Sequence, residues 1–363
     1  MTTLIEAPRR LRSSGHLVPS LPPDDGATPH TNRLGGNRLA GSAAAVLLGA
    51  AVLAAVRLHG RYQADLTRAR QRLAAARSQV AQTACGPIEY ATAGEGVPVL
   101  EVHGIFGGFD QGLLVARPVL GDGFSIIAPS RFGYLGTPLP ADASPARQAD
   151  AHACLLDHLG IERAVVMAHS AGSTSAIQLA LRHPKRVAAL VLVAPAAPGP
   201  GPMAPPKPVM RALFQTDAVF WFLATFFPLS LPIGVPKGLE LTSGDRAEIA
   251  RIMETMLPAT GRRDGFLFDM FVSAPAINSG YPFGEVSVPT LVVTAVDDPL
   301  ASPANARRLA AAIPSACLFE AERGGHLLLG QAELVGDQVK QFIRAHTAEA
   351  QPPGSSMAAP PAP

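Results

Sequence analysis

The sequence predicts an α/β protein with a mostly parallel, doubly wound sheet, a helical lid insertion and an N-terminal membrane helix. Short apolar segments alternate with helical ones over residues 85–345, a pattern typical of a parallel sheet covered on both faces. A proline- and aromatic-rich segment between Pro195 and Pro289 interrupts this alternation. Near the N-terminus, residues 39–56 contain no charged side chain, which indicates a helix that contacts lipid.

Length and composition allow one large domain with additional segments, or two small domains. Of the 363 residues, 48% are hydrophobic and 16% are charged, so the chain can bury a large core. The formal net charge of +2 is too small to indicate a nucleic-acid partner, and we expect none. Cys85, Cys154 and Cys317 lie far apart and lack metal-binding spacing. We therefore expect inert buried thiols and no metal site.

The N-terminal region divides into a tail, a span and a spacer. Residues 1–38 are polar without an apolar period, and we expect them to be disordered. Residues 39–56 are at the short end for a transmembrane helix; a cleaved signal peptide and a buried soluble helix are the alternatives. Residues 57–81 have a helical composition and are expected to form a helical spacer. These segments predict a single-pass anchor that contacts membrane lipid.

Flanking arginines favour one orientation of this span. Arg33 and Arg38 precede it closely, whereas five arginines follow it: Arg57, Arg61, Arg68, Arg70 and Arg72. By the positive-inside rule, this distribution weakly favours the cytoplasmic face for the larger C-terminal portion.

The main domain is expected over residues 82–347, with its first five strands before the insertion. These strands share apolar runs bounded by turn residues: Cys85–Thr92, Val97–His103, Phe124–Pro129, Arg163–Ala168 and Val187–Ala194. One intervening helix begins with Ser144 as N-cap and Pro145 at its first position. A second helix follows Ala171 and ends near His183, before a proline.

The insertion over residues 196–289 is expected to form a helical lid. After it, the strand and helix pattern resumes. A strand is expected at Thr290–Val296, a helix at Pro303–Ile313, a strand at Cys317–Ala321, and a closing helix to about Ala345. Residues 348–363 are mostly Pro, Ala and Ser, and we expect a disordered tail.

The motif Ala168-His-Ser-Ala-Gly172 stands where a buried strand meets a helix. Small residues are needed two positions before and after Ser170, because a bulky side chain there would clash across a tight turn. The turn projects the Ser170 hydroxyl from the sheet edge, near helix N–H groups that favour developing negative charge.

Three further motifs also follow strands. His103-Gly-Ile-Phe-Gly-Gly108 is a glycine-rich loop after the second strand. Asp298 follows the strand that ends near Val296, and His326 follows the last strand. The carboxyl ends of parallel strands share one edge of a sheet, so these groups and Ser170 are expected to converge.

With these motifs in this order, residues 85–345 resemble the α/β-hydrolase fold superfamily, in its serine hydrolase and carboxylesterase-like branch. The departures are Ala168 and Ala295, which stand where the family often has glycine. A serine rather than an aspartate at position 170 argues against the dehalogenase and epoxide-hydrolase branches.

The resemblance implies a catalytic triad. Ser170 would be the nucleophile, His326 the general base, and Asp298 the carboxylate that orients the imidazole. Asp297 is the rival acid, and Asp298 is preferred because the family places the acid directly before this kind of turn.

The resemblance also implies an oxyanion hole and no cofactor. Backbone N–H groups of Ala171 and Ile105 would hold the oxyanion, with Phe106 as the alternative donor. Acyl transfer of this kind requires neither a metal nor a redox cofactor.

The length and aromatic content of the expected lid predict an apolar substrate site. We expect the side chains of Phe106, Phe220, Trp221 and Phe271 to contact substrate; the alternative is that these aromatics form the core of the lid. The expected activity is hydrolysis of an ester or thioester with an apolar moiety. C–C bond hydrolases and cofactor-free haloperoxidases share this triad, so both activities remain alternatives. A non-catalytic small-molecule receptor or scaffold is the alternative from another class.

Overall fold

The computed structural model describes residues 34–201, 204–231 and 233–347. Residues 1–33 and 348–363, which include most of the two tails that we expected to be disordered, lie outside the described residues. Residues 34–38 were expected to belong to the N-terminal tail, but helix α1 begins at Leu34. The chain divides into two compact units, one ending at Leu58 and the other beginning at His59.

Helix α1, Leu34–Ala75, contains the predicted span. From Ala43 onward it includes an 18-residue window with a mean hydropathy of 1.8, none of it buried. Within the part of the chain that the structure describes, this is the one helix long and apolar enough to cross a membrane. Residues 79–81, which we expected to end the helical spacer, belong instead to strand β1, Gln79–Thr83.

The C-terminal end of α1 belongs to the second unit and packs on the insertion. Leu66 and Ala69 are buried in a cluster with aromatic side chains of the insertion, and Tyr62 packs against that cluster. Arg72 contacts the carboxylate of Asp110 and donates hydrogen bonds to two backbone carbonyls of the insertion. The spacer is therefore part of the folded domain and not a solvated stalk.

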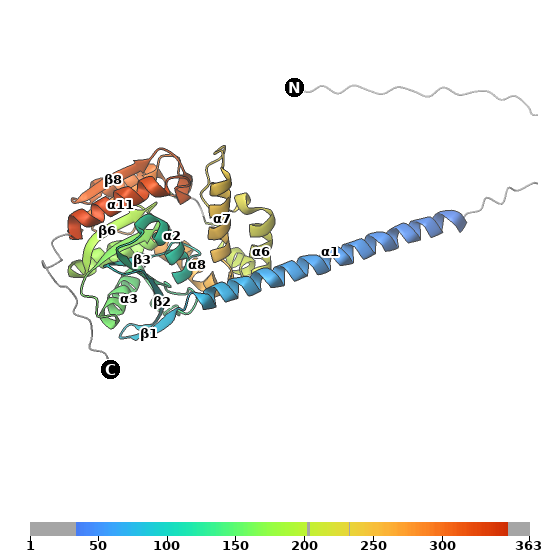
Figure 1. The fold of residues 1–363 in the computed structure, drawn as a ribbon, viewed down its shortest axis with the longest axis horizontal. Coiled ribbons are helices and arrows are strands. Elements are labelled where there is room, and N and C mark those ends of the chain that lie inside the picture. Colours follow the sequence, from blue (N-terminus) through green and yellow to red (C-terminus); the bar gives the residue numbers. More distant parts are fainter. Residues whose placement is uncertain (1–33, 202–203, 232, 348–363) are drawn as a thin grey trace, which may run out of the picture. The chain divides into compact units, whose positions relative to one another are not determined.

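One eight-stranded sheet forms the centre of the second unit, in the order β1-β2-β4-β3-β5-β6-β7-β8 (Figure 1). The strands after β1 are β2 Gly86–Ala93, β3 Val97–Val102, β4 Phe124–Pro129, β5 Ala164–His169, β6 Val187–Val193, β7 Thr290–Ala295 and β8 Ala316–Ala321. The β1–β2 and β2–β4 pairs are antiparallel, and all other pairs are parallel. The predicted mostly parallel sheet is confirmed.

The strand register brings four strand ends together. Val102 of β3 pairs with Ala168 of β5, and His169 of β5 pairs with Val193 of β6. Val193 in turn pairs with Val293 of β7. The loops that follow β3, β5, β6 and β7 therefore leave the sheet at nearly the same level, which is where ligands bind in open α/β sheets.

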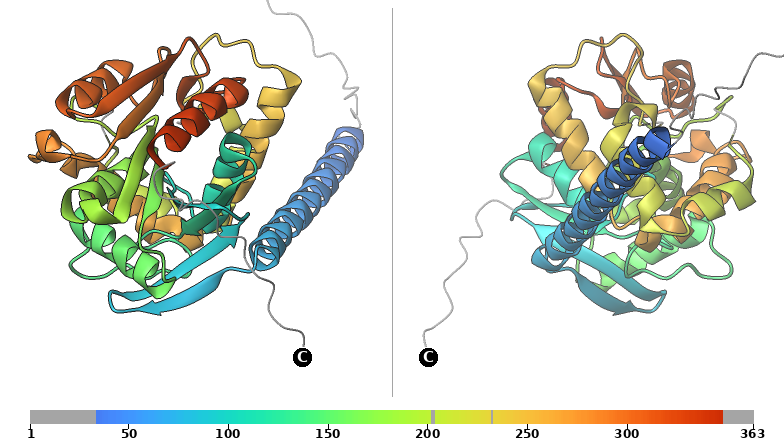
Figure 2. Two further views of the ribbon diagram at one scale, coloured as in Figure 1. Left: turned by 60° about the vertical axis from the view of Figure 1, so that its left-hand side comes forward. Right: turned by 90° about the vertical axis from the view of Figure 1, so that its right-hand side faces the viewer.

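Helices cover both faces of the sheet (Figure 2). On one face, α3 (Pro145–His158), α4 (Ser173–Arg182) and α10 (Pro303–Ala312) contribute to one buried cluster. On the other face, α2 (Phe109–Leu120) and α11 (Ala332–Thr347) pack on a second cluster. The strands that separate these clusters, such as β6, are buried along their whole length, as in parallel sheets covered on both sides.

The insertion is helical, as predicted. Its helices are α5 Lys207–Leu213, α6 Asp217–Phe226, α7 Ser243–Thr255, α8 Arg263–Phe268 and α9 Ala274–Ala276. Helices α5, α6, α7 and α8 share a third buried cluster with the end of α1. A capping box begins α7, in which the Thr242 hydroxyl accepts from the N–H of Asp245 and the Asp245 carboxylate accepts from the N–H of Thr242.

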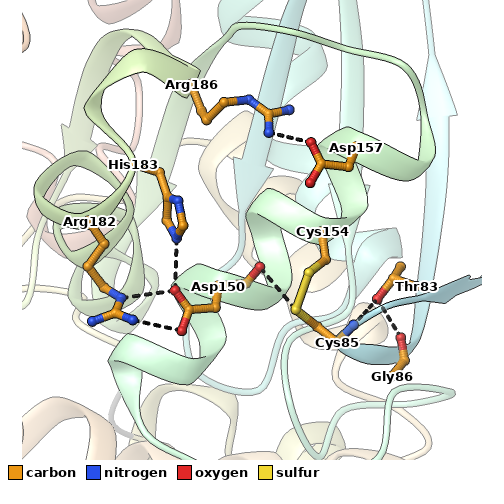
Figure 3. Close-up of a disulfide and its surroundings, with 9 residues drawn as sticks. All are labelled: Thr83, Cys85, Gly86, Asp150, Cys154, Asp157, Arg182, His183 and Arg186. Atoms are coloured by element: carbon orange, nitrogen blue, oxygen red, sulfur yellow. Dashed lines mark hydrogen bonds and ion pairs between the residues drawn. A yellow bond between two sulfur atoms is a disulfide. The ribbon is translucent and has the colours of Figure 1, made fainter.

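The expectation of three inert buried thiols is wrong. Cys85, in the turn between β1 and β2, forms a disulfide with Cys154 of α3 (Figure 3). The two cysteines are 69 residues apart, and only the packing of the edge strands against α3 brings them together. Cys317 is free and exposed. Near the disulfide, Asp150 of α3 accepts hydrogen bonds from Arg182 at the end of α4 (Figure 3).

Candidate active site

The turn at Ser170 is tight and strained. Ser170 has a φ of 48°, in the left-handed region that non-glycine residues rarely adopt. Gly172 is required on the far side of the turn, since a Cβ there would lie 2.3 Å from the carbonyl oxygen of Val102. A Cβ on Gly104 would lie 3.3 Å from that of Ser170, so the glycine-rich loop lies directly against the serine.

His326 is held by Asp298. The Nδ1 atom of His326 is 2.8 Å from Oδ2 of Asp298, whose side chain is fully buried. The other carboxylate oxygen, Oδ1, accepts hydrogen bonds of 2.8 Å from the N–H groups of Leu300 and Ala301. These bonds orient the carboxylate, and its oxygen beside Nδ1 favours the His326 tautomer with its proton on that nitrogen.

The neighbouring acid, Asp297, makes different contacts from those of Asp298. Its carboxylate accepts hydrogen bonds of 3.2 and 2.9 Å from the N–H groups of Gly324 and Gly325. The insertion also holds this loop, because the N–H of His326 donates to the carbonyl of Gly234 at 2.9 Å. A Cβ at Gly234 would lie 2.1 Å from that of His326. Asp297 and Gly234 thus fix the backbone that carries His326.

The glycine-rich loop is fixed by buried polar groups. His103 is fully buried; its Nε2 accepts from the N–H of Arg131 at 3.0 Å, and its Nδ1 lies 2.7 Å from the carbonyl of Gly104. Burial and the nearby Arg131 guanidinium hold the pKa of His103 well below 6.5, so its imidazole is neutral. A neutral ring has one donor and one acceptor nitrogen, as this loop requires.

Arg131 forms a buried ion pair instead of facing the cavity. Its Nη1 donates to Oδ1 of Asp269 at 2.7 Å, and its Nε donates to the carbonyl of His103 at 2.8 Å. Tyr134 donates its hydroxyl proton to Asp269 at 2.5 Å and accepts from the N–H of Phe106 at 3.3 Å. The N–H of Phe106 is therefore engaged, which favours Ile105 as the oxyanion donor on this loop.

Ala171 offers the second N–H group. It lies in the 3₁₀ turn Ser170–Gly172 that leads into α4, and N–H groups in the first turn of a helix have no intrahelical acceptor. A serine hydroxyl, a carboxylate-held histidine and such N–H groups are the set that nucleophilic acyl chemistry requires.

One cavity of about 400 Å³ has both Ser170 and His326 in its wall. Ile105 and Phe106 also line it, together with apolar side chains of the insertion and of α2: Met210, Leu213, Phe214, Phe220, Ile252, Phe266, Leu114 and Val115. The rings of Phe106 and Phe266 stack with centroids 4.1 Å apart. The cavity beside the serine is thus bounded largely by hydrocarbon.

Two of the four aromatic residues expected to contact substrate lie elsewhere. Phe106 and Phe220 line the cavity, but Trp221 and Phe271 are not in its wall. The indole N–H of Trp221 donates to Oδ2 of Asp65 in α1 at 2.8 Å. Phe271 lies beneath the ammonium group of Lys207, 5.9 Å from the ring centroid. Successive residues on α6 face different partners, so Phe220 and Trp221 cannot share one pocket.

Sequence reasoning missed a buried acid behind the serine. Glu101 of β3 is fully buried, and its Oε1 lies 2.7 Å from Nδ1 of His169, which lines the cavity beside Ser170. Burial raises the pKa of Glu101, and His169 partly offsets that effect. The available signal was a lone acid within the apolar strand Val97–Val102, since buried acids need a partner.

Comparison with known proteins identifies the family. A family model described as alpha/beta hydrolase fold matches residues 97–332. A hydrolase of Bacillus subtilis is 39% identical over 111 residues, which cover 30% of this chain and 37% of the relative. A 2-hydroxymuconate semialdehyde hydrolase of a Pseudomonas species is 36% identical over 104 residues, 28% of this chain and 37% of the relative. The chain thus spans little more than a third of the length of these two relatives.

Solved structures match over a longer range. An alpha/beta hydrolase fold protein from Nakamurella multipartita is 30% identical, with a TM-score of 0.59 over 74% of this chain and 99% of its own. A thermophilic esterase from Thermogutta terrifontis is 26% identical, with a TM-score of 0.59 over 75% of this chain and all of its own. The family model covers more than half of the sequence, and the chain belongs to the alpha/beta hydrolase fold family.

Proposed function

We propose that this protein is a membrane-tethered serine hydrolase that cleaves an ester or thioester with an apolar acyl or alcohol part. One observation carries the proposal: His326, held at 2.8 Å by the buried Asp298, lines the same cavity as the strained Ser170. No cofactor is needed for this reaction.

In the proposed reaction, the Ser170 oxygen attacks the substrate carbonyl while Nε2 of His326 accepts the hydroxyl proton. The N–H groups of Ala171 and Ile105 hold the resulting oxyanion. Collapse breaks the bond to the leaving group, which takes the proton from His326, and leaves an acyl-enzyme. Water then attacks the acyl carbon with His326 again as base. This second step releases the carboxylic acid and regenerates Ser170.

The lining of the cavity supports an apolar substrate. Phe106, Phe220 and Leu213 offer no hydrogen-bonding groups from their side chains, so they would bind an acyl or alkyl chain by burial alone. Each buried methylene contributes about 0.8 kcal/mol, so kcat/KM should rise with chain length until the cavity is filled.

A series of p-nitrophenyl esters from acetyl to dodecanoyl tests this function. We expect kcat/KM to rise from acetyl to medium chains, and activity to be absent in Ser170→Ala. Phe220→Ala should flatten the chain-length dependence, whereas Phe271→Ala, outside the cavity, should leave it unchanged. A preference for acetyl would contradict the apolar site. No turnover of any ester, together with tight ligand binding, would favour a non-catalytic receptor.

C–C bond hydrolysis is a second candidate, because two kinds of similar proteins are named for such substrates. One is the Pseudomonas 2-hydroxymuconate semialdehyde hydrolase, and the other is a Burkholderia vietnamiensis hydrolase named for 2-hydroxy-6-oxononadienedioate, 29% identical over 199 residues. If kcat/KM for these two compounds exceeds that for every ester tested, C–C bond hydrolysis would be the function, and the esterase proposal would be wrong.

The apolar helix Ala43–Ala75 supports membrane tethering, and the disulfide bears on its orientation. Disulfides form and persist in oxidising compartments, so the Cys85–Cys154 bond favours the face away from the cytoplasm. This is opposite to the side that the arginine count favours. Three of those arginines, however, pair within the folded domain: Arg61 and Arg68 with Asp65, and Arg72 with Asp110.

Long loops and whole domains are translocated largely irrespective of such charges. A C-terminal alkaline phosphatase fusion, which is active only where its own disulfides form, tests the orientation. We expect an active fusion, and an inactive fusion whose matched fluorescent-protein counterpart is bright would place the domain in the cytoplasm.

A further inference from the structure

The insertion has an outward apolar surface, separate from the catalytic cavity. We call it the lid patch; it comprises the exposed side chains Val219, Phe222, Phe226, Phe227 and Leu229, between 40% and 55% exposed. Residues 218–231 contain no charged side chain. Large apolar groups that gather on a soluble surface usually mark an interaction site.

Helix α6 has three distinct sides. Phe220 is 2% exposed and lines the catalytic cavity, and Trp221 is 4% exposed and packs on α1. Phe222 and Phe226, at 43% and 42% exposed, contact one another with ring centroids 5.1 Å apart. Neither contributes to the wall of the catalytic cavity, so the site described above does not account for their exposure.

The lid patch lies beside the part of α1 that directly follows the span. Trp221 bonds to Asp65 and packs against Tyr62, with ring centroids 5.2 Å apart. The guanidinium of Arg61 lies 5.5 Å from the centre of the Phe226 ring. These contacts are all within the second unit of the chain, so they hold whichever way the preceding span points.

Chain connectivity then fixes how far the lid patch can lie from the bilayer. Arg61 is five positions after Val56, the last residue of the uncharged stretch. Five residues span roughly 17 Å when fully extended and roughly 8 Å as a helix. If residues 39–56 cross the bilayer, Arg61 therefore lies within roughly 17 Å of the end of the span, and Phe226 lies beside Arg61.

We propose that the lid patch binds the bilayer surface, so that the insertion rests in the lipid interface. This inference rests on the membrane anchor in the proposed function. Aromatic and aliphatic groups flanked by arginine are typical of interfacial segments. The side chain of Arg61 is 57% exposed and supplies such a charge beside the ring of Phe226. A docked lid would bring the Phe220 wall of the cavity close to substrates dissolved in the bilayer.

Depth-dependent fluorescence quenching in the full chain tests the proposal. Trp221 is the only tryptophan, so Trp221→Phe gives a background without indole emission. Phe226→Trp in that background reports on the lid patch, with Phe222→Trp as a second reporter should the first fail to fold. Leu318→Trp is the matched control, since Leu318 is 37% exposed on β8 at the opposite edge of the sheet from β1.

In liposomes of brominated phosphatidylcholine and phosphatidylglycerol, we expect the Phe226→Trp emission to be quenched and the Leu318→Trp emission to be unaffected. Carbonate-resistant association is measured first. A chain that does not stay with the liposomes would contradict both the anchor and this inference. A chain that stays, with neither reporter quenched, would overturn this inference alone. Protection of the Phe226→Trp reporter from both brominated lipid and aqueous acrylamide would show that a second copy covers the patch, and would also overturn it.

Discussion

Asp298 Oδ2 lies 2.8 Å from Nδ1 of His326, and the same carboxylate is anchored by two backbone N–H groups. Asp298→Asn keeps the shape but can donate to Nδ1, which favours the wrong tautomer of His326. We expect kcat to fall by about 10⁴-fold with little change in thermal stability. Ester hydrolysis and a melting curve check this.

Asp297→Asn is the matched control for Asp298, because Asp297 contacts only the backbone N–H groups of the His326 loop among the contacts described. It should reduce kcat far less than Asp298→Asn. An equal loss in both variants would contradict the assignment of Asp298 as the residue that orients His326.

Tyr134 links the glycine-rich loop to a buried carboxylate. Its hydroxyl donates to Asp269 and accepts from the N–H of Phe106. Tyr134→Phe leaves both groups without that partner in a buried site, so the free energy of unfolding should fall by about 1–3 kcal/mol. We also expect a lower kcat with nearly unchanged KM, because the loop that carries Ile105 is loosened. A denaturant titration without any shift in midpoint would contradict this account.

The Cys85–Cys154 disulfide closes a loop of 69 residues. Cross-linking a loop of this length lowers the entropy of the unfolded chain, and its loss should cost about 4 kcal/mol. Both dithiothreitol and Cys154→Ser should therefore lower the melting temperature, whereas Cys317→Ser should leave it unchanged. Identical melting curves with and without reductant would be incompatible with this bond.

His152 makes stability depend on pH. It is fully buried in α3, and burial together with the Arg131 guanidinium lowers its pKa from 6.5 to about 3. Below pH 6.5 the unfolded chain binds a proton that the folded chain excludes until about pH 3. The contribution of His152 to stability is thus complete above pH 6.5 and decreases as the pH falls, by about 2 kcal/mol at pH 5.

Chemical denaturation of the wild type and His152→Asn at pH 7.5 and pH 5 measures this effect. The asparagine variant should lose less stability between the two pH values than the wild type. An identical loss in both proteins would mean that other groups cause the pH dependence.

The buried strands of the sheet were predicted from the sequence more completely than the helices and the edge strand. Strands such as Val187–Val193 are buried on both faces and read as continuous apolar runs. Helix α2 escaped prediction because Gly112 and Pro118 weaken its helical pattern. Strand β1 has a polar sequence, with one buried residue in its pattern, as edge strands often do.

Features that depend on long-range packing could not be predicted. Cys85 and Cys154 carry no spacing signal that distinguishes a bond from two free thiols. Trp221 was expected in the substrate pocket because it belongs to the aromatic-rich insertion. Its partner, Asp65 in α1, lies in a segment that looked like a solvated spacer. The motifs at the strand ends correctly predicted that Ser170 and His326 line one cavity. This was possible because the topology of the sheet determines which loops meet.

The role of Ser170 as nucleophile is tested most directly by a fluorophosphonate probe, which forms a bond only with an activated serine. Intact-mass and peptide analysis should locate a single adduct on Ser170 in the wild type and in Ser279→Ala, a control at an exposed serine. Ser170→Ala should not be labelled, and Asp298→Asn should react far more slowly. A folded wild-type protein that stays unlabelled, or an adduct that persists in Ser170→Ala, would contradict the proposed serine hydrolase.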